Sequence, residues 1–163
     1  HMGDELGLGN DRSYRKDPVK AADSRWMNRP AMAWERARRR HDLRTVEGRI
    51  FGGLSRLIRI RQATSLLHGF GLFQPLWTHN DHVLGYARKR PEGTLVVFAN
   101  FDDTPQSIDA RMPFWAGLQG TVRDLLRDGA IPSMDAGRLF LAPLGVMWLV
   151  GDEEVRKRPT RRR

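Results

Sequence analysis

The feature that most constrains this chain is a change of hydrophobic period near residue 69. Over residues 46–64 apolar residues recur at helical spacing, and after residue 69 they form short runs separated by turn-forming Gly, Pro and Asp. Seven strand candidates follow: 74–78, 82–88, 94–101, 106–112, 121–126, 138–142 and 146–150. Short strands at this spacing are typical of a sandwich. The sequence therefore predicts a mainly β fold, with an antiparallel Greek-key-type β-sandwich over 70–151 preceded by one or two helices.

The segment 46–64 is the clearest helix candidate. Its apolar stripe consists of Val46, Ile50, Leu54, Leu57 and Ile58. These positions fall on one helical face, and Thr45 or Asp42 is suited to cap the first turn. Three glycines within the segment each weaken such a helix by about 1 kcal/mol relative to Ala. We therefore expect the helix to be stabilised by packing against another surface, or against a second copy of the chain in a dimer.

The first 45 residues have a different composition. His1 and Met2 are interpreted as a remnant of cloning and are left out of the fold prediction. Residues 3–30 lack a sustained period and are rich in Gly, Asp, Asn, Arg and Pro, which indicates an irregular loop. Residues 31–40 favour a helix, with Pro30 suited to its first turn.

The net charge of +9 is unevenly distributed. Residues 70–155 contain 7 basic and 11 acidic side chains, so the predicted sandwich is acidic. Basic residues gather instead between Arg36 and Arg40 and in the tail 152–163, which we predict to be disordered. Nucleic-acid binding through these flanks is one alternative function, although such tails are usually solvated chain ends.

Two features that the sequence lacks bear on the cellular compartment of the protein. The chain has no cysteine, which excludes disulfides and fits a reducing compartment. No apolar run reaches the roughly 18 residues that span a bilayer. We therefore expect a cytoplasmic protein with no membrane partner.

Five segments carry a family resemblance. They are GDELG (3–7), Asn-Asp (10–11), DSRWMNRP (23–30), FANFDDTPQSI (98–108) and LAPLGVMWL (141–149). Together they resemble the C-terminal part of glycoside hydrolase family 13, the α-amylase superfamily, and within it the amylosucrases and sucrose hydrolases. The resemblance extends from Gly3 to about Val150, so it covers nearly the whole chain.

The resemblance implies a larger parent enzyme built on a (β/α)8 barrel. Residues 3–45 would follow the last barrel strand, 46–67 would be the last barrel helix, and 70–151 the C-terminal sandwich. The parent would transfer glucosyl units from sucrose to α-glucan, or hydrolyse them, using two carboxyl groups and no cofactor. In the family these carboxyl groups come from earlier barrel strands. The fragment is therefore expected to be non-catalytic, with the N-terminal barrel of the same chain as its main partner.

One substrate-binding residue is implied by the resemblance. Arg25, within DSRW, matches the arginine that pairs with an acidic residue at the floor of the sucrose pocket. Arginine suits this role because its planar fork binds a carboxylate bidentately. Asn28 stands where the amylosucrase pattern more often has His, which leaves a sucrose hydrolase or another glucosidase open. No catalytic residue and no metal ligand are predicted.

Two polar groups admit a second interpretation. Asp4 and Glu5 could be interpreted as a catalytic pair of acids. Adjacent carboxylates in a glycine-rich loop are, however, more often structural or solvated. The run His79-Asn80-Asp81-His82 has the composition of a metal site. Between two strands, however, such a run more often marks a hairpin turn.

The aromatic residues bear on a further alternative, an autonomous carbohydrate-binding module. Trp77 and Trp115 would stack on sugar if exposed, but we expect core or interface packing for both. Phe98, Phe101 and Trp148 are predicted to lie in the sandwich interior. A structural domain is therefore preferred over a glucan-binding module.

Overall fold

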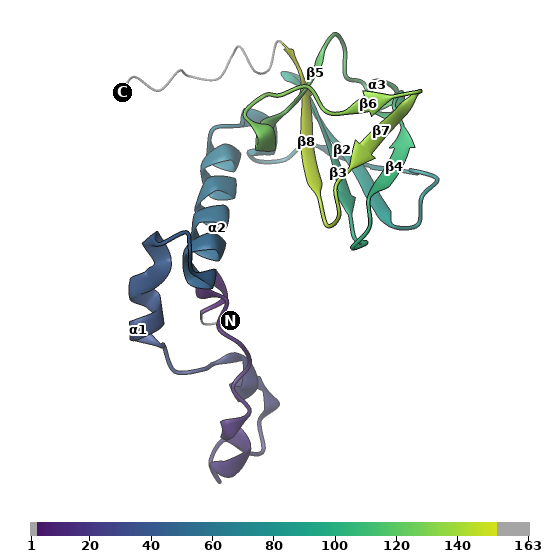
Figure 1. Cartoon of the computed structure of the whole chain (residues 1–163). Coiled ribbons are helices and arrows are strands. Elements are labelled where there is room, and N and C mark those ends of the chain that lie inside the picture. The colour runs from purple at the N-terminus through teal and green to yellow at the C-terminus, as the bar shows by residue number, and fades with distance from the viewer. Residues whose placement is uncertain (1–2, 153–163) are drawn as a thin grey trace. The chain divides into compact units, whose positions relative to one another are not determined.

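The computed structural model describes residues 3–152. The chain divides into two compact units, and the boundary falls between Arg59 and Ile60. The first unit contains short turns and helices (Figure 1): η1 (Asp4–Leu6), η2 (Ser13–Lys16), η3 (Ser24–Asn28), α1 (Trp34–Ala37), η4 (Arg38–His41) and most of α2 (Val46–Gln62). The second unit contains the end of α2, η5 (Ser65–Leu67) and the strands. The helix predicted over 31–40 is present but is divided between α1 and η4.

Aspartates organise the turns of the first unit. The side chains of Asp11, Asp17, Asp23 and Asp42 each accept a hydrogen bond from the backbone N–H two residues later. This local bond competes with regular helix and strand, so the loop-like composition folds as a series of short turns. Among its described residues the unit buries few apolar side chains, namely Leu6, Tyr14 and Ala37.

Helix α2 begins where the sequence predicts, with Thr45 as its cap. The Thr45 hydroxyl accepts a hydrogen bond from the Gly48 N–H at 3.0 Å. Gly48 also permits a close approach of the preceding turn, because a Cβ at this position would overlap the carbonyl oxygen of Asp42. Four stripe residues of the helix are exposed: Val46, Leu54, Leu57 and Ile58.

The second unit is a sandwich of two antiparallel sheets (Figure 1). The larger sheet has the order β1-β2-β3-β8-β5, and the smaller has the order β4-β7-β6. The strands are β1 (Leu72–Leu76), β2 (Val83–Arg90), β3 (Gly93–Asn100), β4 (Gln106–Asp109), β5 (Val122–Asp124), β6 (Met134–Asp135), β7 (Arg138–Leu141) and β8 (Val146–Gly151). Because the chain crosses repeatedly between the sheets, the predicted Greek-key-type β-sandwich is confirmed.

Two apolar clusters stabilise the sandwich. The main cluster fills the space between the sheets and includes Phe98, Ile108 and Leu139, all fully buried. The second covers the other face of the larger sheet, where Leu66 of η5 packs with Leu95 of β3. Strand β3 is therefore buried on both faces, which explains its continuous apolar sequence.

The observed strands differ from the predicted ones in four places. The strand expected over 121–126 ends at Asp124, and Leu125–Arg127 form η6. The strand expected over 106–112 ends at Asp109, and Met112–Trp115 form helix α3, with Pro113 in its first turn. The two-residue strand β6 has no predicted counterpart. Strand β1 lies two residues earlier than predicted.

The interior position predicted for Phe101 is wrong. Phe101 is 71% exposed because it follows the last residue of β3, whereas Phe98 lies within the strand and is fully buried. Core packing, one of the two alternatives expected for Trp77 and Trp115, is also wrong, because these side chains are 74% and 60% exposed. Interface packing of the two stays a prediction. Trp148 is partly buried against the second cluster, as expected for an interior residue.

The predicted tail, 152–163, lies outside the described residues except for Asp152. The carboxylate of Asp152 accepts a hydrogen bond from Arg123 Nε at 2.7 Å, which attaches this residue to β5. Within residues 3–152, no helix is both long enough and apolar enough to span a membrane.

Candidate functional site

Arg25, the predicted substrate-binding residue, lies in η3 with its side chain exposed. Its Nε and Nη2 atoms each lie 2.8 Å from a different carboxylate oxygen of Asp23, so the contact is bidentate. The hydrogen bonds from Arg25 lower the pKa of Asp23 to about 2. Within this chain Asp23 therefore neutralises the guanidinium, and the role of Arg25 at a sucrose pocket stays a prediction.

A hollow of about 420 Å³ lies in the same unit, lined partly by Asp11, Tyr14 and Trp26. The Lys20 ammonium lies 5.2 Å from the centre of the Trp26 ring, and the Arg29 guanidinium lies 5.7 Å from it. The indole therefore already has cationic partners from its own loop. This hollow is not lined by Arg25.

A second hollow, of about 390 Å³, lies where strands β1 and β3 end and β2 begins. Its lining includes Trp77, His79, Asp81, Leu84 and Phe101, and we call it the Trp77 groove. The pairing of β1 with β2 and of β2 with β3 brings these positions together although they span 25 residues of sequence. Three large apolar side chains thus border one concavity while remaining exposed to solvent.

The loop between β1 and β2 fixes the orientation of Trp77. The indole Nε1–H donates to Nδ1 of His79 at 3.0 Å, and the two rings pack edge to face. Between them the buried Thr78 has its hydroxyl 2.7 Å from the carbonyl oxygen of Val83. Because Nδ1 of His79 accepts a hydrogen bond, the neutral ring carries its proton on Nε2 and can donate from there.

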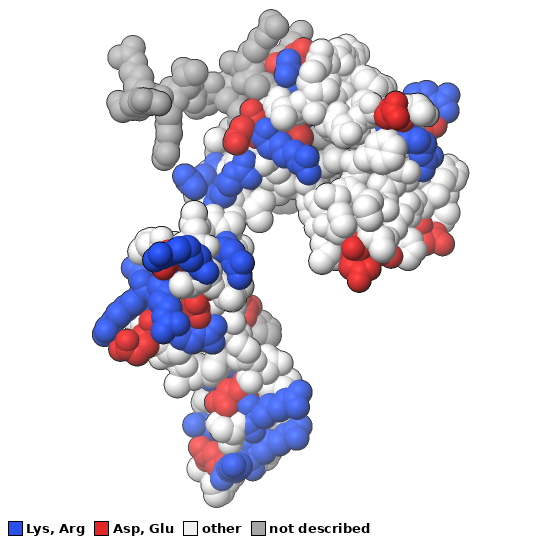
Figure 2. Space-filling model, in the orientation of Figure 1, with Lys and Arg blue, Asp and Glu red and all other residues white. Residues whose placement is uncertain are grey.

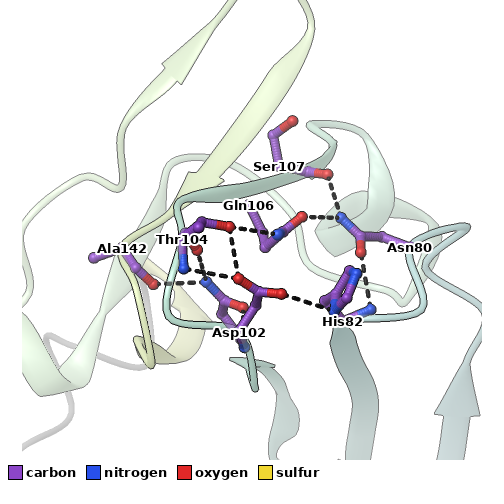
Figure 3. Close-up of polar contacts among 8 residues, drawn as sticks. Asn80, His82, Asp102, Thr104, Gln106, Ser107 and Ala142 are labelled. Carbon is purple, nitrogen blue, oxygen red and sulfur yellow. Dashed lines mark hydrogen bonds and ion pairs between the residues drawn. The ribbon is translucent and has the colours of Figure 1, made fainter.

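Polar side chains next to the groove join the two sheets (Figure 3). Nδ2 of Asn80 donates to the side-chain oxygen of Gln106 and to the carbonyl of Ser107, at 3.0 and 3.2 Å. The Asn80 side-chain oxygen in turn accepts the His82 backbone N–H at 3.0 Å. The amide of Asn80 therefore fastens the β1–β2 loop to β4 of the other sheet.

A second part of this network lies after β3 (Figure 3). The Asp102 carboxylate accepts hydrogen bonds from the Thr104 hydroxyl and backbone N–H, and these bonds lower its pKa. Its other oxygen lies 3.0 Å from Nδ1 of His82. Nδ2 of Asn100 donates to the carbonyl oxygens of Thr104 and Ala142, both at 2.9 Å.

These contacts decide between the two interpretations of the His79–His82 run. The run forms the turn between the antiparallel strands β1 and β2, so the hairpin prediction is confirmed. Asn80 and His82 are engaged in the network that joins the loops. Within the described residues, no group of three or more His, Asp and Glu side chains is arranged to hold a metal ion.

Charge is distributed differently over the two units. Figure 2 shows Lys and Arg side chains gathered on the first unit, whereas the visible face of the sandwich is largely uncharged with separate acidic and basic spots. Several of the arginines in the first unit are paired: Arg36 with Glu47, Arg38 with Glu35, and Arg44 with Asp42.

Comparisons with known proteins agree with the fold. No protein-family model matches the chain. The solved structure of AmyP in complex with maltose matches 72% of this chain at 17% identity, with a TM-score of 0.55. A second AmyP structure, in complex with maltotriose, matches 66% at 20% identity with a TM-score of 0.53. The trehalulose synthase MutB from Pseudomonas mesoacidophila MX-45 is 25% identical over 70% of the chain, with a TM-score of 0.44.

These neighbours are enzymes of the α-amylase family, glycoside hydrolase family 13. The chain spans only about a fifth of their length: 22% of AmyP and 19% of MutB. The likeness to AmyP concerns the fold, which is consistent with a C-terminal β-sandwich of such enzymes.

The Trp77 groove was not predicted as a site, although Trp77 was considered as a sugar-stacking residue in the alternative of a carbohydrate-binding module. Trp77 directly follows the last residue of β1 and Phe101 directly follows the last residue of β3, so both escape the alternation that buries residues within the strands. The sequence does carry one signal, the Trp-Thr-His order that places an indole donor two residues before an imidazole acceptor.

Proposed function

We propose that this chain is the C-terminal part of an amylosucrase-like enzyme of the α-amylase family, acting on sucrose and α-glucans. In this proposal the sandwich is a structural, non-catalytic domain. The observation that carries it is the likeness of the fold to AmyP, together with the motif resemblance that runs from GDELG to LAPLGVMWL. The amylosucrase-like specificity rests on the motifs alone.

The carboxyl groups support the non-catalytic role. A glycosidase of this mechanism needs one carboxylic acid whose pKa is raised so that it can donate a proton near neutral pH. Seven carboxyl groups among the described residues have a lowered pKa: Asp11, Asp17, Asp23, Asp42, Glu47, Asp102 and Asp109. Hydrogen bonds from neighbouring side chains cause these shifts, so the groups favour the charged form.

The exposed stripe of α2 supports the proposal that this helix covers another part of the parent. A barrel helix buries one apolar face against its strands, and Val46, Leu57 and Ile58 are exposed in the chain as it stands. A barrel in the same parent chain is the proposed occupant. A second copy of this chain, in a dimer through α2, is the alternative.

The sequence encoded directly upstream tests the proposal. It should encode a barrel with the two carboxyl groups of a retaining enzyme, and the full-length enzyme should release fructose from sucrose. Fructose in excess of free glucose would indicate glucosyl transfer to glucan, whereas equal amounts would indicate hydrolysis. The 163-residue chain alone should release neither sugar. An upstream sequence without a barrel, or turnover that persists through repurification of the short chain, would contradict the proposal.

In the full-length enzyme the proposed role of Arg25 has its own test. Arg25→Ala should lower kcat/KM for sucrose by roughly tenfold or more, because an acidic pocket residue would lose its partner. The matched control is Arg44→Ala, since Arg44 makes the same bidentate contact with the aspartate two residues before it. Equal turnover in the two variants would remove Arg25 from the site.

A further inference from the structure

We propose that the Trp77 groove binds the non-reducing or internal glucosyl units of an α-1,4-glucan chain. The existence of a sugar site there is inferred from the groove itself, and the choice of an α-glucan rests on the proposed function. The inference goes beyond that function, which assigns the sandwich no ligand.

The first reason is that Trp77 is exposed yet held in one orientation. A solvated indole normally keeps rotamer freedom, and ordering it on binding costs free energy. Here the hydrogen bond from Nε1 to His79 Nδ1, at 3.0 Å, restrains the ring before any ligand arrives. The loop behind it is fastened in turn by Thr78 and Asn80. The groove is therefore pre-organised, as binding sites commonly are.

The second reason is the difference between Trp77 and the other exposed tryptophan of the sandwich. The guanidinium of Arg111 lies 4.8 Å from the ring centre of Trp115, so this indole has a cationic partner. No cation lies over the Trp77 ring in the part of the chain that the structure describes. The faces of Trp77 that remain exposed are thus open to stacking.

The third reason is the chemistry of the lining. Trp77, Leu84 and Phe101 provide apolar surface, while His79 Nε2 and the Asp81 carboxylate provide a donor and an acceptor at its edge. Neither Lys nor Arg lines the groove, so it is unsuited to phosphate or nucleic acid. A pyranose has the matching character, because its C–H face is apolar and its rim carries hydroxyl groups. A neutral carbohydrate chain therefore fits the groove better than a charged polymer.

The test is a titration of the 163-residue chain with maltoheptaose, followed by calorimetry and by the indole N–H signals in a two-dimensional NMR spectrum. We expect saturable binding that shifts the Trp77 indole signal and leaves the Trp115 signal in place. Trp77→Ala should weaken binding at least tenfold, and Phe101→Ala should weaken it less. The matched control is Trp115→Ala, which removes an equally large exposed indole outside the groove and should bind as the unmodified chain does.

Three results would overturn the proposal: no saturable binding of maltoheptaose, equal weakening by Trp77→Ala and Trp115→Ala, or equally tight binding of cellohexaose. A folding defect is recognised separately, because each variant must keep the dispersed amide spectrum of the unmodified chain before its affinity is compared. The outcome is also independent of the parent enzyme. If maltoheptaose did not bind the groove, the proposal of an upstream barrel would still stand to be tested. If no barrel were encoded upstream, binding of maltoheptaose to the groove could still be measured.

Discussion

The polar contacts in the two units of this chain differ in how far apart in the sequence the bonded residues lie. In the first unit, Asp23 and Asp42 each bind the arginine two residues later. In the sandwich, Asn100 and Asp124 instead bind backbone groups 42 and 24 residues away along the chain. Local bonds form wherever the short sequence permits, whereas the distant ones require the whole fold.

The apolar side chains show the same difference. The sandwich has two clusters, and side chains such as Phe98 and Leu149 in the first and Leu66 in the second are almost fully removed from solvent. In the first unit, Val19 and Trp34 are 88% and 71% exposed. Burial of apolar surface is the main favourable term in folding. The sandwich is therefore the self-sufficient domain, and the first unit depends on local turns.

The largest effect is expected at Asp124, which is fully buried. One oxygen of its carboxylate accepts the backbone N–H groups of Leu126 and Trp148, at 3.0 and 3.1 Å. Asp124→Ala removes the acceptor of both part-buried donors and empties a fully buried position, so it should lower the free energy of unfolding by about 2–4 kcal/mol. Chemical denaturation monitored by circular dichroism measures this loss.

The control for Asp124 is Asp109→Ala, which removes a carboxylate that pairs locally with Arg111. We expect less than about 1 kcal/mol of destabilisation there, as is usual for surface substitutions. If the two variants lost equal stability, long-range polar contacts would contribute no more to the stability of the sandwich than local ion pairs do.

A smaller effect of opposite signs is expected at two glycines of α2. Gly48→Ala should destabilise the helix by about 1–2 kcal/mol, because the added methyl group overlaps the Asp42 carbonyl and the turn must move. Gly53→Ala should stabilise it by about 0.5–1 kcal/mol, since that Cβ would meet no atom within 4 Å. Thermal unfolding followed at 222 nm compares the two. Stabilisation by both substitutions would mean that the turn at Asp42 is not packed on the helix.

The smallest effect concerns two exposed ion pairs, one in each unit. Hydrogen bonds from Arg25 and Arg111 lower the pKa values of Asp23 and Asp109, each to about 2. Because the folded pKa lies below the unfolded one, this stabilisation is present above about pH 4 and is lost as the pH falls through about 2. Carboxyl NMR titration should give matching values in both units, and Arg25→Gln should return Asp23 alone toward an ordinary pKa. An ordinary pKa for Asp23 in the unmodified chain would contradict the hydrogen bonds from Arg25 to its carboxylate.

Sequence patterns predicted the parts of the fold that depend on local chemistry. Thr45 was one of two candidate helix caps, with Asp42, because either side chain could act within the first turn, and β3 was found because a run of β-branched and aromatic residues follows a glycine turn. Strand β6 escaped prediction because two residues carry no periodicity. Helix α3 escaped because Met112 and Phe114 suit a strand equally well, and only tertiary packing selects the helix.

The candidate site was less predictable than the fold. The motif around Arg25 indicated a binding residue, but its contact with Asp23 is a property of the folded turn. The Trp77 groove depends on residues that follow the ends of β1 and β3, lie in the loop between β1 and β2, or lie at the start of β2. Exposure of Trp77 and Phe101 is set by the point at which each strand stops, and strand ends are the least certain part of any sequence pattern.

Amide hydrogen exchange over the whole chain tests the central claim, that the sandwich is self-sufficient and the first unit is not. Amides of β3 and β8, such as those of Val97 and Leu149, should exchange only through global unfolding. Amides in η2 and η3 should exchange through local opening that is faster by several orders of magnitude. Equal protection of η2, η3 and β3 would show that the first unit folds cooperatively with the sandwich, and would contradict this account.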